Sequence, residues 1–257
     1  MAYQEVPGDN WDYDSIADLM LVDLQINNRT RQVIMHAPKD GFFYVLDRVT
    51  GELISADPIT KVSWASGIDM KTGKPNVNKG ALYRTDAVVV KPGPSGGHVW
   101  QPWTYSPLTG LVNFPGTEIG PDGVTGNVLY AWDPIARKER WRVAGGGAGA
   151  FAGGSLSTAG NLVFSSVNDR LIAYRADTGE KLTEVALGTT QMGPPISFTI
   201  DGKRYIAVTS AQGTPAGAGG GGRGGAGGGA AAPARPAHLP VLTLDGKAPL
   251  PGTAASN

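Results

Sequence analysis

The sequence contains no cysteine among its 257 residues. This absence excludes disulfides, thiolate metal sites, covalently attached c-type haem and cysteine nucleophiles. The sequence also lacks an excess of charge of either sign, because 22 Lys and Arg residues balance 22 Asp and Glu residues. We therefore expect no electrostatic binding to nucleic acid or to an anionic membrane surface.

Long apolar segments are absent as well. No run approaches the roughly 20 apolar residues that cross a bilayer, so no transmembrane segment is expected. Residues 1–5, Met-Ala-Tyr-Gln-Glu, do not begin a signal peptide, which would start with basic residues and continue with apolar ones. Two alternatives follow: the protein is cytosolic, or its true N-terminus is missing from this chain.

Glycine and proline are abundant, with 38 and 19 residues. Both weaken helix interiors and mark turns, so the composition favours many short strands. Apolar runs of strand length, rich in β-branched and aromatic residues and without a helical period, recur between the turn residues. They lie at residues 33–35, 42–46, 87–90, 128–131, 162–164, 171–174 and 205–208. The predicted fold class is all-β.

A weak internal repeat accompanies these runs. In its clearest copy, residues 131–141, we expect a strand that ends at Asp133, a tight turn, and a second strand that carries Trp141 inward. Residues 45–52 and 173–180 have the same form, with Thr-Gly in the turn. The equivalent positions 47, 133 and 175 are separated by 86 residues, or two steps of 43, and by 42 residues. A period of this size is typical of one four-stranded propeller blade.

Residues 213–236 consist almost wholly of Gly, Ala, Pro and Arg. Such a segment cannot form a core, so we expect a flexible loop at the surface. Residues 239–244 after it read as one more strand. The Gly-rich segment is therefore interpreted as an insertion between strands.

Three aspartates, Asp9, Asp12 and Asp14, alternate with Trp11 and Tyr13. An extended backbone would place Asp12 and Asp14 on one face. Two neighbouring carboxylates repel each other unless a cation or a shared proton relieves them, which suits a hard metal ion with oxygen ligands. The alternative is a solvated acidic turn, because the run lacks the Gly and the distal Glu of an EF-hand loop. Spacing alone leaves both readings open.

Three other side chains are candidates for chemistry. Lys39 lies in a turn between two predicted strands, where its cation could polarise a carbonyl or could simply be solvated. Trp100 and Trp103 could stack on a flat cofactor, although large aromatic side chains more often fill a core.

The histidines and two familiar motifs give no site of their own. The three histidines are widely separated and show no metal-ligand spacing, so structural roles are expected for His36, His98 and His238. Residues 217–222 fit the Gly-x-Gly-x-x-Gly string of a dinucleotide loop, but no helix follows them. Residues 93–97 fit Gly-x-Ser-x-Gly without the helix that a nucleophile elbow requires. A plain turn is the better interpretation.

Taken together, several segments resemble the pyrroloquinoline quinone (PQQ)-dependent alcohol and methanol dehydrogenases, or quinoproteins. The resemblance runs from Asp9 to Pro251, apart from the Gly-rich insertion. The matching segments are residues 9–14 (Asp-Asn-Trp-Asp-Tyr-Asp), 36–48, 97–102, 131–141 and 246–251.

The resemblance implies an eight-bladed propeller of four-stranded antiparallel blades with tryptophan-docking repeats. It implies PQQ and a metal ion, calcium or a lanthanide, near the axis, and PQQ-dependent oxidation of alcohols by hydride transfer to the quinone. Asp12 falls where the family has its catalytic base, and Asp14 matches the additional carboxylate of lanthanide-using members, so both are candidate metal ligands. Lys39 stands where the family places a cation beside the quinone oxygens. Trp100, in a matching segment, is a candidate cofactor-binding residue.

The family also sets limits for this chain. Because 257 residues are too few for eight blades of about 43 residues, we expect residues 1–257 to be an incomplete propeller. The family's other metal-binding carboxylate and amide would lie in a missing N-terminal part, which activity would require. The resemblance implies a periplasmic location and a separate electron acceptor such as a cytochrome c. The alternative is a noncatalytic propeller scaffold or an inactive fragment.

Overall fold

The computed structural model describes residues 2–84, 88–119, 125–146, 153–167, 169–188, 191–211 and 238–247. Within these ranges the regular structure is β, apart from one short 3-10 helix, η1 (Lys79–Ala81). The strands in chain order are β1 (Met20–Ile26), β2 (Arg29–His36), β3 (Phe42–Asp47), β4 (Leu53–Pro58), β5 (Ala65–Ile68), β6 (Pro75–Val77), β7 (Thr104–Ser106), β8 (Leu111–Ile119), β9 (Thr125–Asp133), β10 (Lys138–Gly146), β11 (Ser155–Thr158), β12 (Leu162–Val167), β13 (Arg170–Arg175), β14 (Lys181–Ala186), β15 (Gln191–Ile200), β16 (Lys203–Ala211) and β17 (Val241–Leu242).

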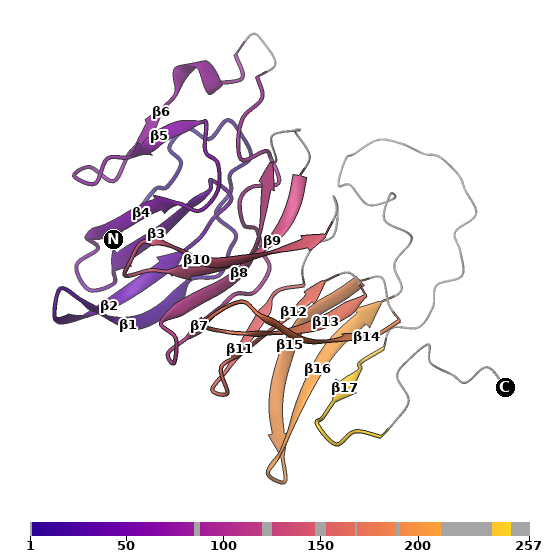
Figure 1. The fold of residues 1–257 in the computed structure, drawn as a ribbon. Coiled ribbons are helices and arrows are strands. Elements are labelled where there is room, and N and C mark those ends of the chain that lie inside the picture. The colour runs from indigo at the N-terminus through magenta and orange to yellow at the C-terminus, as the bar shows by residue number, and fades with distance from the viewer. Residues whose placement is uncertain are drawn as a thin grey trace, which may run out of the picture.

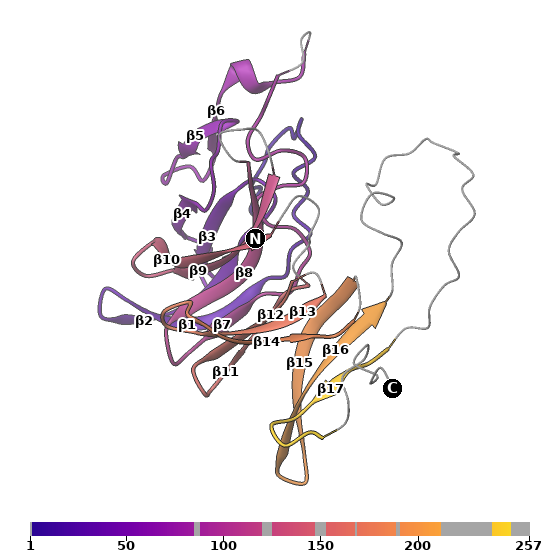
Figure 2. The same cartoon turned by 45° about the vertical axis from the view of Figure 1, so that its right-hand side comes forward.

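The strands form consecutive antiparallel blades. Three sheets have four strands, in the orders β1-β2-β3-β4, β10-β9-β8-β7 and β11-β12-β13-β14. A three-stranded sheet, β15-β16-β17, and the hairpin β5-β6 complete the described part of the chain. Figure 1 shows the sheets following one another from the indigo β1 to the orange β16, and Figure 2 shows the same succession from a second side. The predicted all-β class and the four-stranded antiparallel blades of an incomplete propeller are confirmed.

Apolar side chains are buried mainly where one blade meets the next. Between the first two four-stranded blades, Phe43 of β3 stacks on Trp132 of β9 with ring centroids 5.7 Å apart. The same cluster contains Val33 and Val128, which are buried. Burying a large apolar side chain stabilises the fold by about 1.5–3 kcal/mol. Contacts between blades therefore carry much of the stability.

The predicted repeat is a five-residue turn that joins the last two strands of a blade. In each copy the backbone N–H of the fifth residue donates to the carbonyl of the first, as in Gly51 to Asp47 at 2.7 Å. The fifth residue has a positive φ, 76° at Gly51 and 75° at Gly179, which explains the glycine of the Thr-Gly pair. Arg137 adopts the same conformation with φ 57° in the copy that lacks glycine.

Among the described residues, this turn occurs at two more places that the sequence pattern did not single out. Gly73 donates to Asp69 at 2.7 Å in the turn between β5 and β6, and Gly110 donates to Ser106 at 2.8 Å between β7 and β8. The predicted copies join the last two strands of a four-stranded blade, whereas these turns join β5 to β6 and β7 to β8. The turn is therefore a general hairpin closure in this protein rather than a mark of one position in the blade.

Trp141 docks between two blades as predicted. Its side chain is 8% exposed, and its indole Nε1 donates to the carbonyl of Ala176 at 3.0 Å. The ring lies against the turn of the following blade, where a Cβ added to Gly179 would come within 2.7 Å of it. The tryptophan of one blade thus packs against the hairpin turn of the next blade.

Three expectations about strands and spacing are corrected. Residues 88–90 form no strand, although Val90 is buried, and Ala87 lies outside the described residues. The 86 residues from Asp47 to Asp133 span one step between blades rather than two. The described residues between 59 and 103 (59–84 and 88–103) form the hairpin β5-β6, η1 and loops rich in Pro and Gly instead of a four-stranded blade. The strand expected at residues 239–244 is shorter, since β17 covers Val241–Leu242.

The Gly-rich insertion, residues 213–236, lies outside the described residues. In the described ranges, no helix has the length and apolar character needed to span a bilayer.

Candidate functional site

The acidic run belongs to a loop before β1, which we call the site loop (residues 5–17). The Asp9 carboxylate organises it, because its two oxygens accept the backbone N–H groups of Trp11 and Tyr13, each at 2.9 Å. Asp12 has a positive φ of 69°, so the chain is not simply extended there. Trp11 and Tyr13 consequently point into the protein, whereas Asp12 and Asp14 point outward.

The buried side of the site loop is aromatic. The Trp11 indole donates to the carbonyl of Ala81 at 2.7 Å, and the Tyr13 hydroxyl donates to the carbonyl of Pro92 at 2.5 Å. Both rings lie near Trp64, with centroids 5.1 Å and 5.8 Å away. Burial raises the pKa of Tyr13, which keeps its hydroxyl protonated as a donor. These contacts fix the backbone that carries Asp12 and Asp14.

Lys39 connects the two carboxylates. It lies in the turn between β2 and β3, and its Nζ donates to Asp12 Oδ2 at 2.9 Å and to Asp14 Oδ1 at 2.6 Å. The Lys39 side chain is 9% exposed, whereas those of Asp12 and Asp14 are 74% and 50% exposed. Burial lowers the pKa of Lys39, but its hydrogen bonds to the two carboxylates outweigh that effect, so the net pKa is raised. The structure therefore brings together three of the residues selected from the sequence.

The turn at residues 93–97 packs against the backbone of Lys39. Gly97 donates its backbone N–H to the Lys39 carbonyl at 2.9 Å. Gly96 has φ +72°, and a Cβ there would lie 2.5 Å from Lys39 Cβ and 2.6 Å from Lys39 Cα. Only a residue without a side chain fits, so this turn serves to place a lysine and not to expose a serine.

Gly96→Ala is expected to lower the free energy of unfolding by about 2–4 kcal/mol, because the methyl group meets the Lys39 backbone and the left-handed φ is strained. Urea unfolding of the variant measures this change. Gly126→Ala is the matched control, since a Cβ there meets nothing within 4 Å. Equal stability of the two variants would contradict the close approach of Gly96 to Lys39.

The two tryptophans that follow this turn have different environments. Trp103 is buried, packs edge-on against Phe43 at 5.8 Å, and donates to the Asp18 carbonyl at 3.1 Å, so it belongs to the core. Trp100 is 56% exposed and forms no ring contact with other described residues. Its assignment to a cofactor stays a prediction.

His98 ties this loop to the turn that carries Lys39. Its two ring nitrogens lie 2.7 Å from the carbonyl oxygen of Ala37 and 2.9 Å from that of Gln101. Burial lowers the pKa of His98. The structural role predicted for this histidine is confirmed.

Asp40, next to Lys39, was not selected from the sequence. Its carboxylate is fully buried and accepts hydrogen bonds from the Tyr44 hydroxyl at 2.5 Å and the Phe42 backbone at 2.9 Å. Burial raises the pKa of Asp40 to about 7. The available signal was an acidic residue two positions before an apolar run that forms a fully buried strand.

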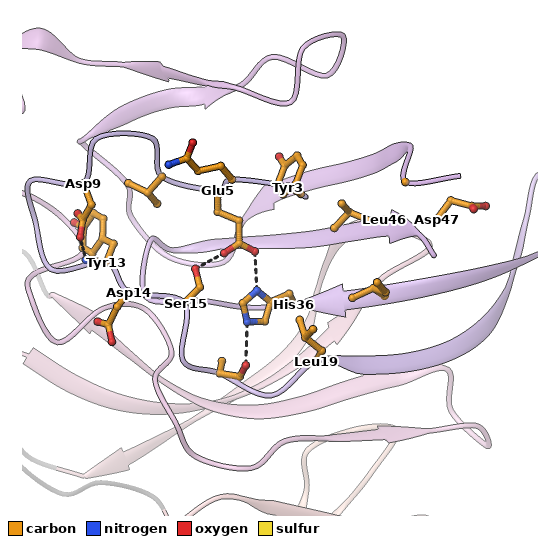
Figure 3. Close-up of a pocket in the computed structure, with 15 residues that line it drawn as sticks. Tyr3, Glu5, Asp9, Tyr13, Asp14, Ser15, Leu19, His36, Leu46 and Asp47 are labelled. Atoms are coloured by element: carbon orange, nitrogen blue, oxygen red, sulfur yellow. Dashed lines mark hydrogen bonds and ion pairs between the residues drawn. The ribbon is translucent and has the colours of Figure 1, made fainter. Parts of the chain in front are cut away.

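A pocket of about 690 Å³ opens beside the site loop. Figure 3 shows Asp14 and Tyr13 on one side of it and the Glu5–His36 pair in the middle. His36, which ends β2, approaches Glu5 Oε1 with Nδ1 at 2.6 Å, and Ser15 also donates to the Glu5 carboxylate. The structural role expected for His36 is confirmed, whereas Glu5 gave no signal in the sequence.

The donor set at the site suits part of a metal site. Asp12 and Asp14 supply hard, exposed oxygen donors, which calcium prefers, but calcium takes six to eight oxygens. Within the described ranges, no cluster of three or more His, Cys, Asp or Glu side chains could hold a metal ion. The two aspartates could by themselves supply only part of such a ligand set.

Comparison with known proteins places this geometry in a family. The model of the PQQ family, described as glucose/ethanol/alcohol dehydrogenase, beta-propeller domain, matches residues 2–67 and 136–206, which is more than half of the chain. The quinohemoprotein alcohol dehydrogenase of Comamonas testosteroni is 40% identical over 247 residues, covering 82% of this chain and 34% of that protein. The 1-butanol dehydrogenase (cytochrome c) of Thauera butanivorans is 35% identical, covering 82% and 35%.

Solved structures agree. The crystal structure of the Comamonas testosteroni enzyme superposes with a TM-score of 0.82 at 34% identity and covers 97% of this chain and 41% of that one. A europium-containing methanol dehydrogenase gives a TM-score of 0.75 at 28% identity, covering 81% and 42%. The chain spans about a third of the length of the curated relatives that it matches. With the family model, the blades and the docked Trp141 in agreement, this chain belongs to the PQQ-dependent alcohol dehydrogenase family, the quinoproteins.

Proposed function

We propose that this chain contributes one wall of the active site to a PQQ-dependent alcohol dehydrogenase, working with the further blades that its relatives possess. The observation that carries the proposal is the Lys39 ammonium, which bridges the exposed carboxylates of Asp12 and Asp14. Both aspartate side chains keep half or more of their surface open to solvent, which a purely structural ion pair would not require. The arrangement suits a site that receives a substrate from outside.

We assign the catalytic base to Asp12. Lys39 donates to Asp12 Oδ2, and Asp12 Oδ1 accepts no hydrogen bond from the described residues, so that oxygen is available for the hydroxyl proton of an alcohol. Lys39 keeps its positive charge and holds both carboxylates in place. When bound, PQQ would accept the electrons removed from the alcohol, and the metal ion would polarise the reacting oxygens.

Three further residue roles belong to the proposal. Asp12 and Asp14 would supply carboxylate ligands to calcium or a lanthanide ion. The likeness to a europium-containing methanol dehydrogenase supports the lanthanide. Lys39 would lie beside the cofactor, and the exposed Trp100 would stack on it. The whole of residues 1–257 would form a partial propeller with an insertion at residues 213–236.

The proposal extends to the electron acceptor and the location of the protein. We propose a separate acceptor such as a cytochrome c, because one relative is named as a cytochrome c-linked 1-butanol dehydrogenase. We also propose a periplasmic location, as the family resemblance implies.

Reconstitution with PQQ tests both the function and the metal. The protein in its longest encoded form is loaded with PQQ and either calcium or a light lanthanide, and alcohol-dependent reduction of a dye is measured. We expect turnover, and we expect it to be at least about tenfold faster with the lanthanide, because Asp14 adds a negative ligand that favours a trivalent ion.

Asp14→Ala separates the two parts of this proposal. Loss of the additional carboxylate should reduce the lanthanide preference while some calcium-supported turnover remains. Equal activity of the unaltered protein with both metals would refute the lanthanide preference. Absence of turnover with either metal would instead favour a noncatalytic propeller scaffold or an inactive fragment.

A further inference from the structure

One imidazole joins the two ends of the site loop. His36 Nδ1 lies 2.6 Å from Glu5 Oε1, and His36 Nε2 lies 3.1 Å from the carbonyl oxygen of Ala17. Glu5 precedes the acidic run and Ala17 follows it. Figure 3 shows both contacts as dashed lines on either side of the His36 ring. The loop is therefore closed at its base, as in compact surface loops whose ends lie close together.

Both partners of His36 are acceptors. A carboxylate and a carbonyl oxygen can only accept hydrogen bonds, so both ring nitrogens must donate for both contacts to be hydrogen bonds. A neutral imidazole donates from one nitrogen alone, whereas an imidazolium donates from both. His98 also contacts two acceptors, but both are neutral carbonyls, and burial lowers its pKa. One acceptor of His36 is instead the Glu5 carboxylate, whose negative charge stabilises the imidazolium, so the described geometry is that of a cationic His36.

The same short segment of backbone carries the other half of the site. His36 is the last residue of β2, and Lys39 follows three residues later. The Glu5 carboxylate reinforces the closure, because it also accepts a hydrogen bond from Ser15, next to Asp14. Closing the loop at His36 therefore fixes the two aspartates relative to the lysine that they contact.

We propose that cationic His36 is a positioning residue, which closes the site loop through Glu5 and Ala17 and so holds Asp12 and Asp14 against Lys39. The proposal rests on the proposed function for its effect on catalysis. The closure of the loop itself does not depend on PQQ, metal or alcohol.

The charged groups around His36 define its pH dependence. Burial lowers the pKa of His36, but the hydrogen bond and negative charge of Glu5 outweigh this, with a smaller contribution from Asp40, and the net pKa is raised above 6.5. His98 is the other nearby imidazole, and the charge of His36 contributes to the lowering of its pKa. Because the folded pKa is raised, the closure is complete below the unfolded value and is lost as pH rises through the folded pKa.

Amide hydrogen exchange on the full chain tests the proposal. The protection factors of the Trp11 and Tyr13 amides, corrected for intrinsic exchange, are measured as pH rises from 5 to 9. We expect them to fall by at least about tenfold through the titration of His36, while the amides of Val163 and Tyr174 in a distant blade keep their protection. Protection that does not change with pH at Trp11 and Tyr13 would overturn the proposal.

Two variants assign that change to His36. His36→Gln should give low protection of the site loop at every pH, and Glu5→Gln should move the midpoint to lower pH, because the negative partner is lost. Asp40 has a pKa of about 7, to which the charge of Glu5 contributes, and it remains in both variants. A pH transition that persists in His36→Gln would therefore assign the change to Asp40 and contradict the proposal. His238→Gln, outside the first blade, is the matched control and should behave as the unaltered chain.

Discussion

Asp12→Asn is expected to lower the rate of alcohol-dependent dye reduction by about 10²–10⁴-fold in the PQQ-loaded protein, the range typical of a lost general base. Asparagine has nearly the same shape and can still accept the hydrogen bond from Lys39 Nζ, which is 2.9 Å from Asp12 Oδ2. It cannot take up the hydroxyl proton. The variant should therefore fold normally and bind substrate, while kcat falls.

The control for this prediction is Asp23→Asn. Asp23 lies on β1 and pairs with Arg48 at 3.3 Å at the surface, away from the site loop. Exposed ion pairs of this kind contribute little to stability. The Asp23→Asn variant should therefore fold normally and show the turnover of the unaltered protein. If Asp12→Asn kept full turnover, Asp12 would not be the base, and Asp14 would become the candidate.

Trp141→Ala is expected to lower the free energy of unfolding by about 3–5 kcal/mol, the usual cost of truncating a buried tryptophan. The change removes the ring that fills the space between two blades and the hydrogen bond from Nε1 to Ala176 at 3.0 Å. The turn at Gly179 would lose the surface against which it packs. Urea unfolding followed by tryptophan-independent circular dichroism measures the loss.

Trp100→Ala makes the same chemical change at an exposed position. Because Trp100 is 56% exposed, its loss should alter the free energy of unfolding by no more than about 0.5 kcal/mol. A similar small effect for both variants would mean that Trp141 does not carry the contact between blades.

Much of the fold was predictable because it depends on local chemistry. Apolar runs between turn residues predicted most of the strands, and the five-residue turn whose last residue has a positive φ accounts for the repeat. The exception at residues 88–90 has the same apolar composition as the true strands. Composition alone does not supply the neighbouring strand whose hydrogen bonds a strand requires.

The candidate site was predictable in part. Asp12, Asp14 and Lys39 were selected from the sequence, and the structure brings them together across 27 and 25 residues of chain. The expected extended geometry was too simple, since Asp12 adopts a positive φ and the Asp9 carboxylate shapes the loop. Asp40 was missed because an acidic residue in a turn is usually solvated, and its burial depends on residues that pack over it.

By itself, the sequence determined the β class, the blade-forming turns, the inward Trp141 and the residues able to carry chemistry, because each depends on neighbours a few positions away. Only the tertiary structure decided that the Lys39 ammonium pairs with both aspartate carboxylates of the site loop. The same holds for the contact of Gly96 with Lys39 and for the contacts of His36 with Glu5 and Ala17. These contacts join segments distant in the chain. No local pattern encodes them, because they form only when the blade and the loop before it pack together.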